Sequence, residues 1–125
     1  QAEYLKSMPE RSVFHVADDG ARVVGLQSVE PYHSAPGLAH VGDIATFVAL
    51  DAHRSGIGAQ LTAATIEAAR AIGYEKIMAM IRADNPGAIA FYEKQGFEII
   101  GVAKRHARVR GALVDEVLAE RWCGA

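Results

Sequence analysis

The sequence contains little cysteine, no excess of charge of one sign and no long apolar run. Its 125 residues include one cysteine, so no internal disulfide can form, and a reducing, cytoplasmic location is expected. No stretch approaches the roughly 20 apolar residues that span a bilayer, and no signal-peptide pattern opens the chain, so we expect no membrane association. The net charge of −2 provides no basic surface for nucleic acid, and the histidines show no metal-ligand spacing. We therefore expect no nucleic-acid partner and no metal.

Length and composition are those of one globular domain. Half of the residues are hydrophobic and 22% are charged, which excludes a disordered or low-complexity chain. A chain of 125 residues builds one hydrophobic core, so we expect a single domain over residues 1–125. The chain begins with Gln1 rather than methionine, which favours a trimmed or N-terminally incomplete domain.

Strand and turn signals alternate over the first 50 residues. Two apolar runs, 12–17 and 22–30, flank the turn residues Asp18-Asp19-Gly20 and predict a hairpin. Residues 31–37 contain two prolines and a glycine, which indicates a loop. Residues 39–50 are rich in β-branched and aromatic side chains, so they predict a third strand of an antiparallel meander.

After residue 50 the pattern alternates between helix and strand. Helical apolar spacing and capping residues predict helices from Ile57 to Ile72 and from a cap at Asp84 or Asn85 to Gly96, and apolar runs predict strands at 76–82, 97–109 and 113–122. The order β-β-β-α-β-α-β-β predicts an α/β fold. We expect a mixed, mostly antiparallel sheet with a central parallel crossover and helices on both faces.

A glycine-containing turn lies where the third strand gives way to the first helix. Its sequence is His53-Arg54-Ser55-Gly56-Ile57-Gly58-Ala59. A helix N-terminus presents unpaired amides and positive dipole, and glycine lets an anion approach the backbone, so with Arg54 nearby the turn suits a pyrophosphate. The alternative is a connection that merely turns the chain. A Rossmann fingerprint is not met, because Leu61 replaces its third small residue, and no Walker loop is present.

A second motif follows one strand later, at residues 85–97, and reads N-x-x-A-x-x-F-Y-x-x-x-G-F. Taken with the glycine turn before it, the sequence resembles the GNAT superfamily of acetyl-CoA-dependent N-acetyltransferases, whose cofactor turn is written Q/R-x-x-G-x-G/A. The resemblance covers roughly residues 12–122. It implies a GNAT-like fold without the family's opening strand and helix, of which residues 1–6 would be a remnant. His53 stands where the family usually has glutamine or arginine.

The resemblance implies where acetyl-CoA binds. In the family, the strand before the glycine turn splays from the next parallel strand, and the pantetheine arm enters the gap. The arm would be held by backbone groups of Phe47, Val48 and Ala49, with an amide near Val48 polarising the thioester carbonyl. The residues implied for the pyrophosphate are His53, Arg54, Ser55, Gly56, Ile57, Gly58 and Ala59. On the second helix Asn85 would contact the arm, and Ala88 and Phe91 would pack beside it.

The implied reaction is direct attack of a primary amine on the acetyl carbon in a ternary complex. Tyr92 matches the tyrosine that protonates the leaving thiolate; its other interpretation is a core tyrosine beside Phe91. For the base, the family's glutamate position falls on Gly42. Its neighbour Asp43 fits only if a bulge shifts the register, because neighbours on a strand face opposite sides. The alternative bases are His33, His40 and Glu116.

The sequence therefore predicts an N-acetyltransferase whose acceptor is a small-molecule amine or an amino acid. A peptide N-terminus is a second class of acceptor. The alternative on the same fold is a non-catalytic acyl-CoA-binding or regulatory module. A weaker alternative is a nucleotide-binding domain in which Arg82 contacts the ribose phosphate of NADP. Family members often form homodimers, and the sequence does not decide whether this chain does.

Overall fold

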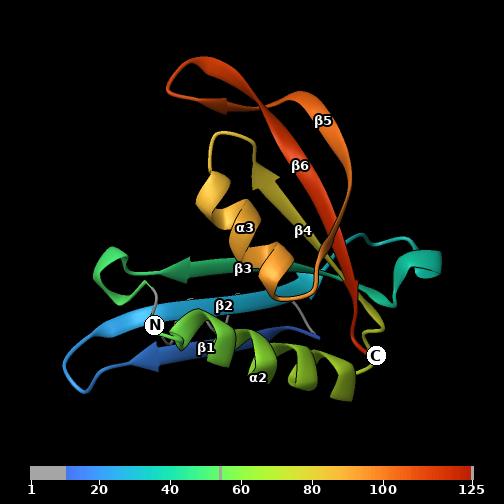
Figure 1. Cartoon of the computed structure of the whole chain (residues 1–125). Helices are drawn as coiled ribbons and strands as arrows, with labels where there is room; N and C mark the ends of the chain where they lie inside the picture. Colours follow the sequence, from blue (N-terminus) through green and yellow to red (C-terminus); the bar gives the residue numbers. More distant parts are fainter. Residues whose placement is uncertain (1–10, 54, 125) are drawn as a thin grey trace.

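The computed structural model describes residues 11–53 and 55–124. Its elements, in chain order, are β1 (Val13–Asp18), β2 (Val23–Pro31), the short 3₁₀ helix η1 (Pro36–Leu38), β3 (Val41–Val48), the 3₁₀ helix η2 (Leu50–Ala52), α2 (Ile57–Ala71), β4 (Lys76–Arg82), α3 (Pro86–Lys94), β5 (Glu98–Val109) and β6 (Ala112–Trp122) (Figure 1). The predicted order of strands and helices is confirmed. The second helix is capped by Asn85, whose side chain accepts a hydrogen bond from the amide of Ala88.

The six strands form one mixed sheet in the order β1-β2-β3-β4-β6-β5. Neighbouring strands are antiparallel except β3 and β4, which are parallel and are joined through α2. The predicted meander and the central parallel crossover are therefore confirmed, and with them the α/β fold class.

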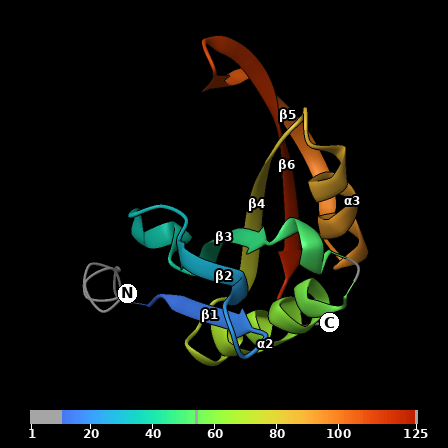
Figure 2. The ribbon, with the colours of Figure 1, turned by 90° about the vertical axis from the view of Figure 1, so that its left-hand side faces the viewer.

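Both described helices lie on the same face of the sheet (Figure 2). On α2, Thr62 reaches Gln27 of β2, and on α3, Tyr92 reaches Thr46 of β3, which is the cross-strand partner of Gln27. The expectation of helices on both faces is thus met on one face only in the part of the chain that the structure describes. The reason is the strand order. The connections β3–α2–β4 and β4–α3–β5 both advance in the same direction along the sheet, and right-handed crossovers then place both helices on one side.

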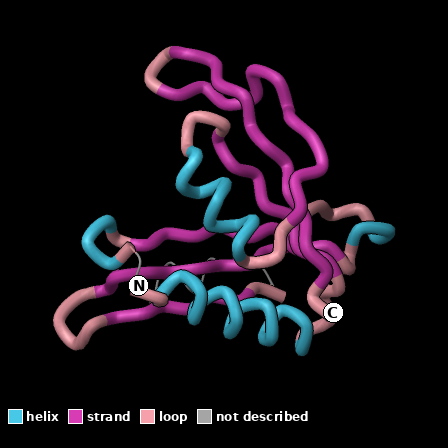
Figure 3. The backbone as a smooth tube through the Cα atoms, viewed as in Figure 1, coloured by secondary structure: helices cyan, strands magenta, loops and turns pink. Residues whose placement is uncertain are grey.

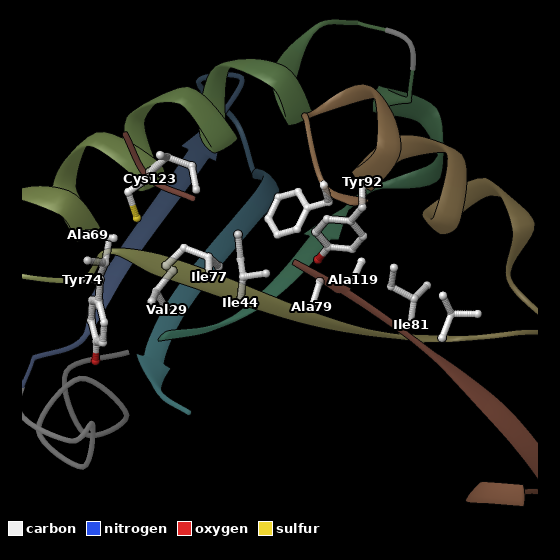
Figure 4. Packing of buried hydrophobic residues seen from close by; sticks show 14 residues of the cluster. Val29, Ile44, Ala69, Tyr74, Ile77, Ala79, Ile81, Tyr92, Ala119 and Cys123 are labelled. Carbon is white, nitrogen blue, oxygen red and sulfur yellow. The ribbon is translucent and has the colours of Figure 1, made fainter. Parts of the chain in front are cut away.

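The main core fills the space between this face and the two helices. Val29, Ile77 and Ala69 are fully buried there, from β2, β4 and α2 respectively. Figure 4 shows Tyr92 of α3 lying over the same layer, with its hydroxyl turned toward the sheet. A smaller cluster of Val24, Ala49 and Ala52 packs where η2 meets α2.

The parallel strands β3 and β4 stay together for only three residue pairs. These join Val41–Asp43 to Lys76–Met78, after which the strands diverge (Figures 1 and 3). Each strand follows its other neighbour instead: β3 remains paired with β2 up to Val48, and β4 remains paired with β6 up to Arg82. The splay that the resemblance implies is therefore present. We call the gap between residues 44–48 and 79–82 the fork.

Candidate active site

The backbone of β3 turns alternate residues into the fork. The amide of Ala49 donates to the carbonyl of Val24, and the carbonyl of Val41 accepts from the amide of Tyr32. With a continuous register between β2 and β3, odd-numbered residues of β3 form the hydrogen-bonded pairs. The backbone groups of Thr46 and Val48 consequently point away from β2, into the fork.

Of the three residues expected to hold the pantetheine arm, only Val48 has a backbone group available for it. Phe47 occupies a hydrogen-bonded position opposite Leu26, and Ala49 uses its amide on Val24 and its carbonyl on the amide of Ala52. The carbonyl of Val48 accepts from the Nε2–H of His53, over 2.9 Å. The amide of Val48 remains, which is the group that the resemblance implies for the thioester carbonyl.

The glycine turn opens α2 without a side-chain cap. Gly56 is the N-cap residue at φ +86°, a conformation that favours glycine, and it makes no side-chain capping hydrogen bond. Among described residues, the amides of Gly56, Ile57, Gly58 and Ala59 have no partner, whereas the amide of Ser55 already donates to Ala52. The turn therefore has the unpaired donors that an anion needs, beginning at Gly56 rather than Ser55. Arg54 lies outside the described residues.

Gly58 is in contact with α3. A Cβ at this position would lie 2.6 Å from Cε1 of Phe91, too close for any side chain. The two motifs noted in the sequence, the glycine turn and the Phe-Tyr helix, thus pack directly on each other. Ile57, in contrast, packs into the smaller core cluster, so its side chain is structural and only its amide is available.

His53 is directed toward the backbone of its own loop. Since the Val48 carbonyl can only accept, the Nε2 atom of His53 carries the hydrogen in that contact. Nδ1 is the nitrogen left for another partner. Where the family has a glutamine or arginine side chain, His53 thus has only its Nδ1 atom left for a contact.

Asn85 and the apolar side of α3 line the fork from the face of the sheet that the helices cover. The Asn85 Oδ1 atom is used in the cap, which leaves the Nδ2 amide group as a donor. Ala88 and Phe91 line the fork from the same side and also pack against the core. This helix brings Asn85, Ala88, Phe91 and Tyr92 together, as expected from their spacing.

Tyr92 lies at the base of the fork. Its side chain is buried, with 7% of its surface exposed, and its hydroxyl donates to Oγ1 of Thr46 over 2.7 Å. Burial raises the pKa of the phenol above its ordinary value, and the negative charge of Asp43 adds to this, while the hydrogen bond to Thr46 acts in the opposite direction. The phenol is therefore protonated at neutral pH. Tyr92 also packs edge-on against Phe91 and Phe97, so both interpretations from the sequence describe it.

A cavity of about 1090 Å³ joins these features. Its walls come from the end of β3, η2, the first turn of α2 and the inner face of α3. It runs from Tyr92 and Thr46 to His53 and Gly58. The other lining residues are Arg22, Phe47, Val48, Ala49, Leu50, Asp51, Asn85, Gly87, Ala88, Ala90, Phe91 and Lys94.

Asp43 lies on the opposite face of the sheet, at the last pair before β3 and β4 separate. The register of β3 is continuous, so the bulge that was required to turn Asp43 toward the helices is absent. Desolvation by the surrounding strands, together with the charges of Glu30 and Glu116, raises the pKa of Asp43 to about 6. Because the sheet is open beyond this pair, Asp43 borders the fork from the side without described helices.

The alternative bases differ in position. Glu116 is the cross-strand partner of Arg82 on β6, and it is close enough for its charge to act on Asp43. His33 accepts a hydrogen bond from the amide of Ala35, and neither His33 nor His40 lines the cavity. Arg82 forms an exposed ion pair with Asp84 over 3.0 Å and does not line the cavity.

Three residues that the sequence analysis did not single out connect to Tyr92. Thr46 accepts from Nε2 of Gln27 over 3.0 Å, and the same nitrogen donates to Oγ1 of Thr62 over 2.9 Å. Strand alternation alone indicates that Thr46 shares a face and a backbone direction with Val48. No local pattern links Gln27 or Thr62 to the site, because both reach it through tertiary packing.

Comparison with known sequences identifies the family. Residues 1–97 match the sequence model of the acetyltransferase (GNAT) family, so the chain belongs to this family. Two curated relatives, from Pseudomonas paraeruginosa and Pseudomonas aeruginosa, are each described as L-methionine sulfoximine/L-methionine sulfone acetyltransferase. Each is 34% identical over 101 residues, which is 80% of this chain and 59% of the relative. The chain thus spans about three fifths of the length of these relatives.

Solved structures share the fold. A ribosomal-protein-alanine N-acetyltransferase from Brucella melitensis matches with a TM-score of 0.88 and 30% identity over 97% of this chain and 75% of that protein. A phosphinothricin acetyltransferase from Sinorhizobium meliloti, solved with acetyl-CoA, matches with a TM-score of 0.85 and 21% identity over 97% of this chain and 66% of that protein. Among the described residues no helix is long and apolar enough to cross a membrane, and no cluster of three or more candidate metal ligands is found.

Proposed function

We propose that this chain is an N-acetyltransferase domain that transfers the acetyl group of acetyl-CoA to the primary amine of a small, amino-acid-like molecule. The observation that carries this proposal is the position of Tyr92. Its protonated hydroxyl lies at the base of a fork whose cavity leads to the unpaired amides at the start of α2. Anion site, channel and proton donor thus lie along one continuous cavity.

The residues of the cavity fit acetyl-CoA in two respects. The amides from Gly56 to Ala59 are free among described residues and face no side-chain cap, which suits the pyrophosphate. The Val48 amide and the Asn85 side chain flank the fork, which suits the amide-rich pantetheine arm. Bound acetyl-CoA would supply the activated acetyl group as a thioester.

Two proton transfers are assigned to the residues of the chain. Tyr92 gives its phenolic proton to the sulfur as the carbon–sulfur bond breaks. Asp43 takes a proton from the incoming ammonium, directly or through water, which leaves a neutral amine to attack. The second proton that the nitrogen loses as the amide forms passes to water. A carboxyl group with a pKa of about 6 is mostly ionised at neutral pH and is a stronger base than an ordinary aspartate. Val48 polarises the carbonyl with its backbone amide.

The acceptor class rests on the relatives and on charge. The curated relatives act, by their descriptions, on methionine sulfoximine and methionine sulfone, which are amino-acid analogues. Glu30 and Glu116 reinforce the negative charge of Asp43 on the open face, and a cationic amine is attracted to such a group. The proposed acceptor is therefore an ammonium-bearing small molecule that enters from this face.

The test is a thiol-release assay with acetyl-CoA, run on this chain and on a version extended at its N-terminus. The acceptor panel contains methionine sulfoximine, methionine sulfone, phosphinothricin, free amino acids, polyamines and peptides with an N-terminal alanine. Acetyl-CoA binding is measured by calorimetry in parallel. We expect thiol release with the amino-acid analogues. Binding of acetyl-CoA without release by either version on any acceptor would instead favour the non-catalytic regulatory module, and turnover of peptides alone would overturn the acceptor class.

A further inference from the structure

We propose that Thr46, oriented by Gln27, is a positioning residue for Tyr92: it fixes the phenol before proton transfer and donates a hydrogen bond to the phenolate afterwards. This inference rests on the proposed function, because it concerns the tyrosine that the proposal makes the proton donor. It assigns a role to two residues that neither sequence motif contains.

The Thr46 hydroxyl can form only a limited number of hydrogen bonds. A hydroxyl oxygen has two lone pairs and one hydrogen. The Oγ1 atom accepts from the Tyr92 hydroxyl over 2.7 Å and from Nε2 of Gln27 over 3.0 Å. Both lone pairs are therefore filled by donors.

The hydrogen of the Thr46 hydroxyl is consequently left over. It has no acceptor among the described residues, and Thr46 lines the cavity. A threonine held in this way is an acceptor toward Tyr92 and keeps a spare donor in the same place. A valine of the same shape would offer neither.

The side chain of Gln27 is completely buried. Its Nε2 atom donates both to Thr46 and to Thr62, while its Oε1 atom is buried without a partner. A buried carbonyl without a donor destabilises a fold, and an apolar side chain at this position would avoid that cost. The amide nevertheless keeps its two hydrogens on the two threonines, which is what forces Thr46 to present a lone pair and a hydrogen to the site.

Thr62 fixes the other end of this hydrogen-bond network. Thr62 accepts from Gln27 and donates to the carbonyl of Gly58, over 2.8 Å, in the first turn of α2. Gln27 is thus fixed against the same turn that presents the unpaired amides. The chain Tyr92–Thr46–Gln27–Thr62, which we call the hydroxyl–amide chain, connects the proton donor to the anion site through the protein interior.

The proton transfer involves Tyr92, the departing sulfur and water. Before transfer, the Tyr92 O–H donates to Thr46. When that proton passes to the departing sulfur, the phenolate oxygen becomes an acceptor, and the free hydrogen of Thr46 turns toward it. No proton leaves Thr46, and the phenolate regains a proton from water after the products depart. The hydrogen bond reverses its direction without any movement of heavy atoms.

The experiment compares Thr46→Val, which removes the hydroxyl, with Thr46→Ser, which keeps it. Both are made in the wild-type chain and in Tyr92→Phe, and kcat is measured with acetyl-CoA and an accepted amine. We expect Thr46→Val to lower kcat roughly tenfold in the wild type and less than about twofold in Tyr92→Phe, because the lost hydrogen bond acts through the phenol. Thr46→Ser should restore most of the rate. An equal loss in both backgrounds would overturn the inference.

A matched control separates positioning from stability. Thr65 is another fully buried threonine of α2, whose Oγ1 contacts Nδ1 of His15 over 3.2 Å and has no contact with Tyr92. Thr65→Val removes a comparable hydroxyl outside the hydroxyl–amide chain. Its kcat should stay within about twofold of the wild type even where its melting temperature falls. A loss in Thr65→Val equal to that of Thr46→Val would also overturn the inference.

A second readout does not depend on turnover. The Cζ resonance of Tyr92, observed by NMR in protein with isotope-labelled tyrosine and assigned by its loss in Tyr92→Phe, reports ionisation of the phenol. The neighbouring charged group that acts on it is Asp43 on β3. Thr46→Val should delay the onset of ionisation to higher pH, since it removes a donor to the phenolate, and Thr65→Val should not. An unchanged onset together with a low rate of Tyr92→Phe would overturn the inference alone, whereas full activity of Tyr92→Phe would overturn the proposed proton donor and the inference with it.

Discussion

The two faces of the sheet carry different chemistry where β3 and β4 part. On the face covered by the helices, Tyr92, Thr46, Gln27 and Thr62 are uncharged and linked by hydrogen bonds. On the other face, three carboxylates gather around the first open position: Asp43, Glu30 and Glu116. In the described part of the chain, none of these three forms a salt bridge.

This difference separates the proposed proton donor, Tyr92, from the proposed proton acceptor, Asp43. A phenol gives up its proton in catalysis only if it holds that proton at rest, and burial among neutral groups ensures this by raising its pKa. A carboxylate removes a proton from an ammonium only if its pKa approaches the working pH, and desolvation with two like charges brings that of Asp43 to about 6. The sheet keeps the two environments apart, and in the proposed mechanism both act on one reactant through the fork.

The largest effect is expected on the helix side, for Tyr92→Phe. The variant keeps the ring and its packing against Phe97 but loses the proton that the thiolate receives. We expect kcat to fall roughly a hundredfold, the scale of general-acid catalysis, with little change in acetyl-CoA affinity. Steady-state kinetics and calorimetry measure the two quantities. A rate close to that of the wild type would mean that the donor is water, and the contrast between the faces would lose one of its halves.

The next effect concerns binding on the same side, for Gly58→Ala. The added Cβ meets Phe91 at 2.6 Å, so the Phe91 ring, α3 or the start of α2 must shift. An overpacking cost of about 1–3 kcal/mol that falls on the amide cradle corresponds to a roughly five- to 150-fold weaker binding of acetyl-CoA. Calorimetry measures the change.

The control for this variant is Gly111→Ala. Gly111 has φ +82° in the β5–β6 turn, and a Cβ there meets nothing within 4 Å. It therefore tests general backbone strain far from the cavity. Equal loss of affinity in both variants would show that the close contact with Phe91 does not support the cradle.

On the open side of the sheet, Asp43→Asn removes the carboxylate that we propose as the base. We expect kcat/KM above pH 7 to fall roughly tenfold, because a base is lost while the shape is kept, and the decrease toward low pH near pH 6 to disappear. The stability effect has the opposite sign. A carboxyl whose pKa is raised on folding destabilises the fold once it is ionised in the folded state, so Asp43→Asn should raise the melting temperature at pH 8 but not at pH 3. A pH profile and thermal melts check both. Retention of the limb near pH 6 would assign it to another group.

Elements and motifs of this chain were predictable from its sequence because their signals are local. Helical spacing from Ile57 and the capping residue Asn85 define helices within a few residues of the observed ends. The glycine turn and the Phe-Tyr helix each lie within one short segment, so Tyr92, Gly56 and Gly58 could be singled out from the sequence, whereas the face of the sheet on which they lie could not.

Features that depend on strand order and distant contacts were not predictable. Both helices share a face because β4 and then β5 each lie further along the sheet in the same direction, and no local pattern encodes that strand order. Thr46 and Tyr92 are 46 positions apart, and Gln27 and Thr62 are 35 apart. On the open side, Glu30 acts on Asp43 because β2 and β3 pair in one particular register, which spacing along the chain does not give. The motifs of the helix side are thus visible in the sequence, whereas the carboxylate cluster of the open side is not.

The smallest effect is expected on the open side of the sheet, for Glu30→Gln. Glu30 is the cross-strand partner of Asp43, and its negative charge disfavours ionisation of that carboxyl. Its removal should lower the pKa of Asp43, which stays above the ordinary value of 3.8 because desolvation is the larger cause. Since the base acts when ionised, the acid limb of kcat/KM should move to lower pH. The kcat at pH 5 should rise about twofold. Above pH 7 kcat should stay unchanged, because there only the attraction between Glu30 and the cationic acceptor is lost, and that attraction acts on KM.

The control for Glu30→Gln is Glu67→Gln, which removes one negative charge from the exposed surface of α2 without a contact to Asp43. It should leave the limb unchanged, and added salt should shrink the effect of Glu30→Gln more than any effect of Asp43→Asn, since screening weakens charge–charge interactions and not a missing base. A limb that moves equally in both variants would mean that net charge sets it. A limb that moves only in Glu30→Gln makes the register of β2 and β3 a determinant of the working pH.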